Sequence, residues 1–186
     1  MLILGSKSPR RQEILTMAGY KYKVVVSDVD EEVDATSITD MSLKIAKKKC
    51  DAIFKDYKDD TVICADTIVV IDNTVLGKPK DKCDARHMIN MLQGRCHEVY
   101  TSVIVKTINK EVEFLEKTKV YVRAMTNDEI EEYINMAEPY DKAGAYAIQG
   151  YFAKYIEKID GDYYNVMGLP IANLSKVLDE LKNENR

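Results

Sequence analysis

The run from Val62 to Ile71 constrains the fold more than any other part of the chain, because its residues are almost continuously apolar. Such a run is typical of a central β-strand that is buried on both faces. Asp66 and Thr67 interrupt the apolar pattern, so we expect a polar break in this strand. Burial of a lone carboxylate is costly. Backbone amides in a bulge, a cationic partner or a metal ion must therefore compensate Asp66.

Helices and strands alternate along the rest of the sequence without a repeat or a linker rich in Pro, Gly or Ser. Apolar periodicity and capping residues predict helices over 9–18, 39–54, 82–93, 127–134 and 171–181, and β-rich runs predict strands over 1–4, 23–27, 98–108, 111–124 and 155–159. The runs 98–108 and 111–124 read as a hairpin joined through Asn109 and Lys110. Crossovers together with a hairpin predict an α/β fold with a mixed sheet, formed by a single domain over 1–186.

The segment from Gly5 to Arg11 joins the first strand to the first helix. Gly5 permits the turn, Ser8 suits the N-cap and Pro9 suits the first helical position. The helix N-terminus and two adjacent arginines would then face one loop, which is an arrangement that binds phosphate. A capped surface helix with solvated charges is the alternative for this segment alone. The Walker pattern is absent, because no second Gly followed by Lys and Ser or Thr is present.

Two lysines could bring positive charge to Asp66. Lys49 falls at the edge of the apolar face of the helix over 39–54, where it either extends to solvent or meets an anion. Lys78 follows a short turn after Ile71, and the resulting hairpin could return it towards Asp66. The acidic loop over 28–32 is either a solvated turn or the source of a carboxylate that shares a divalent ion with Asp66.

Composition excludes several classes of protein. A net charge of -4 argues against bulk electrostatic binding of nucleic acid or anionic membrane. No apolar stretch is long enough to span a bilayer and no leader opens the sequence, so we expect a cytoplasmic protein. The four cysteines are scattered and are interpreted as reduced core thiols. With only two histidines, a zinc site of the usual spacing is not expected.

Taken together, these residues resemble the Maf family of nucleoside triphosphate pyrophosphatases over nearly the whole chain. The order and spacing of several short motifs carry the resemblance. They are Ser6–Arg11, Asp30-Glu31, Lys49, Ala65-Asp66-Thr67, Gly77-Lys78-Pro79, Gly94 with His97, Glu138–Gly150, Asn165-Val166 and Gly168-Leu169-Pro170.

The resemblance implies a two-lobed α/β fold with a central cleft, similar to that of the inosine triphosphate pyrophosphatases. It also implies hydrolysis between the α- and β-phosphates, giving a nucleoside monophosphate and pyrophosphate. The segment 141–150 looks like that of the subgroup acting on dTTP and UTP, whereas the sister subgroup prefers 7-methyl-GTP. Relatives often form dimers, so a homodimer is a further expectation.

Roles for individual residues follow from the resemblance. Asp66 corresponds to the proton acceptor for the attacking water. Substrate contacts are implied for Ser6, Arg10, Arg11, Lys49, Thr67, Lys78 and Gln149. Glu31, with or without Asp66, would hold Mg²⁺ or Mn²⁺, and the sequence leaves open whether Asp66 acts as base, as ligand or as both. Arg11, Thr67 and Gln149 are the positions that bear on the choice of nucleotide.

Three rival functions fit these residues less well. A Ser-His-Asp hydrolase using Ser6 or Ser8 with His97 lacks a nucleophile elbow, and His97 is better explained as structural. A non-enzymatic protein of septum formation would not explain cations gathered around Asp66. Nucleic-acid binding through Arg10 and Arg11 is disfavoured by the net negative charge of the chain and by the lack of a wider cluster of basic residues around these arginines.

Overall fold

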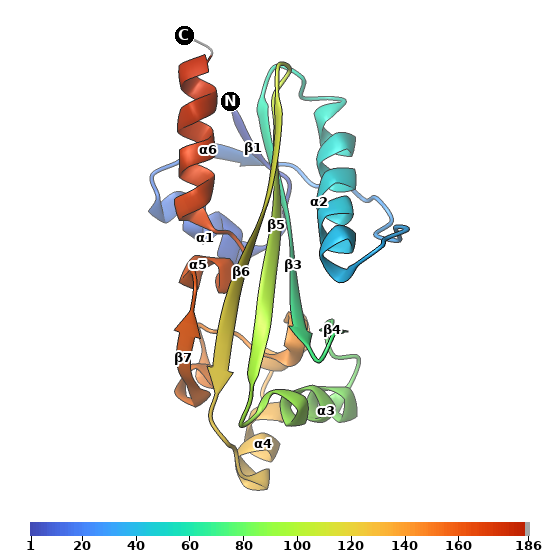
Figure 1. Cartoon of the computed structure of the whole chain (residues 1–186), viewed down its shortest axis with the longest axis vertical. Coiled ribbons are helices and arrows are strands. Elements are labelled where there is room, and N and C mark those ends of the chain that lie inside the picture. The colour runs from blue at the N-terminus through green and yellow to red at the C-terminus, as the bar shows by residue number, and fades with distance from the viewer. Residues whose placement is uncertain (185–186) are drawn as a thin grey trace. The chain divides into compact units, whose positions relative to one another are not determined.

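The computed structural model describes residues 1–184, and over these residues it contains one seven-stranded sheet. The strand order is β2-β1-β3-β5-β6-β7, with β4 paired to β3 off this path (Figure 1). The strands are β1 (Leu2–Leu4), β2 (Tyr22–Val24), β3 (Thr61–Ile71), β4 (Thr74–Leu76), β5 (Cys96–Lys106), β6 (Glu111–Val122) and β7 (Ile156–Asp160). β1 is parallel to β2 and β3, whereas β4 and β7 are antiparallel to β3 and β6. The predicted mixed sheet is confirmed.

Helices connect and flank these strands. The α-helices are α1 (Pro9–Met17), α2 (Ile38–Phe54), α3 (Lys82–Leu92), α4 (Asn127–Ile134), α5 (Tyr163–Met167) and α6 (Ile171–Glu184), and the 3-10 helices are η1 (Glu138–Asp141), η2 (Ala143–Ala145) and η3 (Tyr151–Tyr155). No helix within the described part of the chain is both long and apolar enough to cross a membrane.

The predicted capping residues explain where the helices begin. The Asp81 side chain accepts a 2.8 Å hydrogen bond from the amide of Asp84, and Thr126 and Glu129 form the predicted capping box at α4. Ser8 occupies the N-cap of α1, but its side chain makes no capping bond. Its amide instead donates to Ser6 Oγ at 3.2 Å. The loop before α1 is therefore fixed by Ser6 rather than by Ser8.

The expected central strand with a polar break is confirmed: β3 is continuous over Thr61–Ile71, and Asp66 and Thr67 are a half-buried pair between buried residues. One other expectation about strands was wrong in detail. The strand expected over 23–27 covers only Tyr22–Val24.

The chain divides into two compact units, each assembled from separate segments. Unit 1 contains Met1–Asp66, Thr101–Glu116 and the chain from Gly168 onward, and unit 2 contains Thr67–Tyr100 and Lys117–Met167. The predictions of a single domain over 1–186 and of a central cleft stay predictions.

Each unit has its own hydrophobic core. In unit 1, α2 lies along β3 (Figure 1) and packs through Ala46, Cys50 and Ile53 on apolar residues of β1, β3 and β5. In unit 2, α3, α4, η2 and η3 pack on β3, β4, β5 and β6 around Tyr133 and Phe152. The residues of the predicted site are divided between the two units.

Candidate functional site

Asp66 is the last residue of the first segment of unit 1 and lies within β3. Its side chain is 15% exposed, and its Oδ1 lies 3.3 Å from Lys49 Nζ. Burial raises the pKa of the Asp66 carboxyl above its usual value, and the positive charges of Lys49 and Arg11 oppose that rise. A partly desolvated carboxylate is a stronger base than a fully solvated one, which suits a proton acceptor.

Lys49 forms ion pairs with carboxylates, which is one of the two arrangements predicted for it. Its Nζ lies 2.7 Å from Glu31 Oε1 as well as 3.3 Å from Asp66 Oδ1, and its side chain is 19% exposed. The Glu31 side chain is 61% exposed and comes from the loop between β2 and α2. The neighbouring Lys48 donates instead to the carbonyl of Glu32 at 3.1 Å. One ammonium therefore joins two carboxylates that are far apart in sequence.

Arg11 is tied to the protein by several of its donors. Its Nε donates to the carbonyl of Gly168 at 2.7 Å, and its Nη1 donates to Ser6 Oγ at 3.1 Å and to the carbonyl of Ala65 at 2.8 Å. Burial lowers the pKa of the Arg11 guanidinium, and the charge of Asp66 opposes that shift. Arg11 thus links the loop before α1 to the residue preceding Asp66, whereas the adjacent Arg10 is partly exposed at the start of α1.

Two serines beneath Asp66 were missed by sequence reasoning. Ser42 Oγ donates to the carbonyl of Asp66 at 3.3 Å, and Ser102 Oγ donates to Ser42 Oγ at 2.8 Å. Both serines are fully buried. A signal was present for Ser42, because it precedes Lys49 by two helical turns and so lies on the same face of α2. Nothing in the sequence marks Ser102, which lies in β5.

Unit 2 holds Thr67, Lys78 and Gln149. Thr67 is the next residue of β3 and is half-buried, whereas Lys78 and Gln149 are exposed. Leu76 pairs with Val69, so the chain that carries Lys78 runs back in the direction of Thr67. The amide of Gly144 donates to the carbonyl of Gly77 at 3.0 Å. That bond ties the loop bearing Lys78 to the segment bearing Gln149.

His97 has the structural role that the sequence suggested. Its ring is 1% exposed, and its Nε2 lies 2.7 Å from the hydroxyl of Tyr146. Burial lowers the pKa of the imidazole to about 4. A neutral ring committed to a tyrosine is unsuited to serve as the base of a Ser-His-Asp triad.

Glu31 and Asp66 match the chemistry of a hard divalent cation. Among residues 1–184, no group of three or more His, Cys, Asp and Glu side chains is arranged to hold a metal ion. Two carboxylates that already face one ammonium can face one metal cation, and Mg²⁺ commonly takes its other ligands from water and substrate phosphates. The residues therefore fit a metal that is shared with a phosphate substrate.

One sequence interpretation needs correction. Cys50 and Cys64 are buried in the core of unit 1, but Cys83 and Cys96 are exposed. Cys83 lies in α3 and Cys96 opens β5, and neither position faces a core.

Comparison with known proteins places these features in a family. The family model described as Maf-like protein matches residues 1–181. A protein of Bacillus cytotoxicus named dTTP/UTP pyrophosphatase is 45% identical over 96% of this chain and 94% of its own length. A protein of the same name from Bacillus mycoides is 41% identical over 98% of this chain and 96% of its own length. Among solved structures, the Staphylococcus aureus Ham1 protein matches with a TM-score of 0.48 and 11% identity, covering 96% of this chain and 98% of that one.

Proposed function

The chain belongs to the Maf-like protein family, and we propose that it hydrolyses dTTP and UTP to the nucleoside monophosphate and pyrophosphate. The observation that carries this proposal is the partly buried Asp66, held beside Lys49 and Arg11. This site lies in a chain whose relatives, at 41% and 45% identity, are named dTTP/UTP pyrophosphatases.

Asp66 acts as the general base in the proposed reaction. It removes a proton from a water molecule, the water oxygen bonds to the α-phosphorus, and the bond from that phosphorus to the oxygen bridging to the β-phosphate breaks. The electron pair leaves with pyrophosphate. Burial raises the pKa of Asp66, which makes it a stronger base than a solvated carboxylate.

Cations neutralise the triphosphate in this scheme. Arg10, Lys49 and Lys78 supply the positive charge. Ser6 contributes by fixing the loop, since its Oγ accepts from Arg11 and from the amide of Ser8. Phosphoryl transfer depends mainly on such positioning and charge stabilisation.

Glu31 would hold the divalent metal, Mg²⁺ or Mn²⁺, so that Asp66 stays available as the base. When bound, the ion would supply positive charge to the phosphates and would make a bound water more acidic. Lys49, which contacts both carboxylates, would then be released to bind phosphate.

Base selection is assigned to Gln149 together with Thr67 and Arg11. The amide of Gln149 offers both a donor and an acceptor, which match the edge of uracil or thymine. A base with another hydrogen-bond pattern would leave these groups unpaired, and unpaired polar groups lower affinity. Arg11 acts indirectly in this scheme, because its guanidinium fixes the backbone at Ala65.

Pyrophosphate release from a panel of dTTP, UTP, CTP, GTP and 7-methyl-GTP with Mg²⁺ tests the proposal. We expect dTTP and UTP to be cleaved fastest, and Asp66→Asn to lower kcat by at least about a hundredfold because the general base is lost. Asp59→Asn is the matched control, since Asp59 is an exposed acid of unit 1. Chelation should abolish the activity, and added Mg²⁺ or Mn²⁺ should restore it.

The outcomes separate the parts of the proposal. Cleavage of no triphosphate, or full activity of the Asn variant, would contradict the enzymatic function. Preference for 7-methyl-GTP would contradict only the pyrimidine assignment. A cytoplasmic location and a homodimer stay predictions of the sequence.

A further inference from the structure

Glu138 is a carboxylate that the proposed reaction does not use, although its contacts lie beside Gln149. It opens η1, and its Oε2 accepts a 2.8 Å hydrogen bond from the amide of Tyr151. Its Oε1 lies 3.3 Å from the amide of Phe152 and 3.1 Å from the hydroxyl of Tyr133. The carboxylate therefore binds the first two amides of η3, which begins two residues after Gln149.

The same carboxylate also lies against Gly150. A β-carbon added at Gly150 would come within 2.7 Å of Glu138 Cδ and would contact Oε2 at a still shorter separation. Only the missing side chain of glycine leaves room for the carboxylate at this point. The backbone of Gly150, next to Gln149, thus packs directly against the Glu138 carboxylate.

The beginning of the segment 142–150 is held by other contacts. Gly144 packs on Val69, where an added β-carbon would lie 2.9 Å from Cγ1. Ala145 has a φ of 60°, a left-handed conformation that is uncommon outside glycine, and its carbonyl lies 3.0 Å from the hydroxyl of Tyr133. Tyr146 contacts His97. At the C-terminal end of this segment, where Gln149 lies, the Glu138 carboxylate binds the amides that follow it.

We propose that Glu138 is a positioning residue for base selection: by binding the amides of Tyr151 and Phe152, it fixes the turn that presents Gln149 to the pyrimidine. This inference rests on the proposed function and extends it to a residue outside the substrate contacts. Glu138 touches no reacting atom in this scheme. Its loss should therefore alter the discrimination between bases more than the chemical step.

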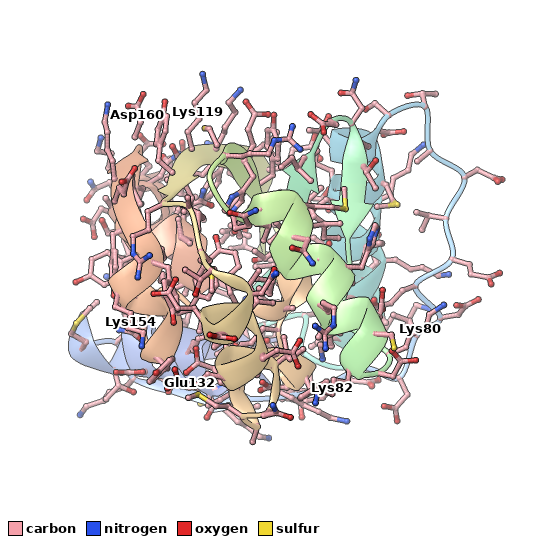
Figure 2. The ribbon with its side chains drawn as sticks, turned by 90° about the horizontal axis from the view of Figure 1, so that it is seen from below. Lys80, Lys82, Lys119, Glu132, Lys154 and Asp160 are labelled. Atoms are coloured by element: carbon pink, nitrogen blue, oxygen red, sulfur yellow. The ribbon has the colours of Figure 1, made fainter. Side chains whose placement is uncertain are left out.

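Glu138→Gln tests the inference, because the amide keeps the size of the side chain but replaces one acceptor oxygen with a donor. We expect the ratio of kcat/KM for dTTP to that for CTP to fall about tenfold, through a higher KM for dTTP with kcat within about twofold of the wild type. Glu132→Gln is the matched control. Glu132, labelled in Figure 2, contacts the hydroxyl of Tyr151 but none of these amides, so its ratio should not change.

Gly150→Ala is a second variant, in which the new β-carbon displaces the carboxylate and the φ of 159° also strains the backbone beside Gln149. It should lower the same ratio, and it supplies the readout should Glu138→Gln fail to fold. Gln149→Ala should lower the ratio to the same level, and adding Glu138→Gln to it should lower the ratio no further, because both changes remove one function.

The failure of this inference can be told from the failure of the proposed function. The activity and base preference of the wild type test the proposed function alone. If the wild type prefers dTTP and both Glu138→Gln and Gly150→Ala keep that preference, Glu138 does not position Gln149. An equal loss of activity towards every base, with the ratio unchanged, would likewise overturn the inference.

Discussion

At the scale of single residues, the burial of His97 makes the stability of the protein depend on pH. Burial lowers the pKa of its imidazole from 6.5 to about 4 in the folded state. The unfolded chain then binds the proton more readily than the folded chain, so this stability is complete above about pH 6.5 and is lost as the pH falls towards 4. One pKa unit corresponds to about 1.4 kcal/mol.

Replacing His97 should remove that dependence. We expect the stability advantage of the wild type over His97→Gln to shrink by about 2 kcal/mol between about pH 7.5 and pH 5, as measured by urea unfolding. The exposed His87 offers a control, because His87→Gln should leave the wild-type pH dependence in place. A constant difference between wild type and His97→Gln over this range would show that the pKa of the imidazole is the same in the folded and unfolded states.

Residues of the site differ in how far the sequence revealed them. Lys49 could be identified because helical periodicity alone places it at the edge of the apolar face of α2. The bonds of Arg11 could not, because its acceptors are carbonyls of Ala65 and Gly168 that only folding brings near α1. A pattern of side chains carries no information on which distant carbonyl a guanidinium will meet.

At the scale of elements, the junction of β1 with α1 depends on a close approach at Gly5. Its amide donates to the carbonyl of Ile63 at 2.7 Å. A β-carbon at this position would lie 2.8 Å from Ile53 Cδ1 and would also overlap Cys64 Sγ. The turn therefore packs directly on β3 and α2.

Gly5→Ala should destabilise the protein by about 1–3 kcal/mol, the usual cost of overpacking a buried position. Thermal or denaturant unfolding measures this loss. Gly77→Ala is the matched control, because a β-carbon there meets nothing within 4 Å. Equal stabilities of the two variants would mean that the junction has room that the structure does not show.

The elements themselves were largely predictable. Asp81, Thr126 and Glu129 marked helix starts correctly, since capping is a local interaction between residues three apart. Ser8 had the right residue type and position, yet Ser6 makes the bond that fixes the loop. Residue preferences at a helix N-terminus do not show whether Ser6 or Ser8 will make the hydrogen bond that fixes the loop.

At the scale of the whole molecule, the chain builds two units from interleaved segments. The accessibility of the four cysteine thiols reports on the packing of these units. Cys50 and Cys64 lie in the core of unit 1, whereas Cys83 and Cys96 lie on the surface of unit 2. A thiol reagent should therefore modify Cys83 and Cys96 quickly in the native protein, and Cys50 and Cys64 only after denaturant is added. Mass spectrometry of modified peptides identifies each site.

The variant Cys83→Ser serves as the control for this experiment, since it should remove one fast site and leave the slow sites unchanged. Rapid modification of Cys50 or Cys64 without denaturant would show that α2 separates from β3 in the native state. Such a result would also call the position of Lys49 beside Asp66 into question.

The sequence by itself determined the α/β class, the caps and the motif residues, because periodicity, capping and turn preferences act over a few neighbouring positions. Only the tertiary structure decided which partners compensate Asp66. Lys49 reaches its carboxylate from α2 and is itself bound by Glu31 from a loop, and Arg11 adds a second positive charge. Ser42 donates to the backbone carbonyl of Asp66, and Ser102 donates to Ser42. The shifted pKa of Asp66 depends on its burial, and the hydrogen bonds of Arg11 depend on carbonyls from distant segments. Both arise only once those segments have packed together.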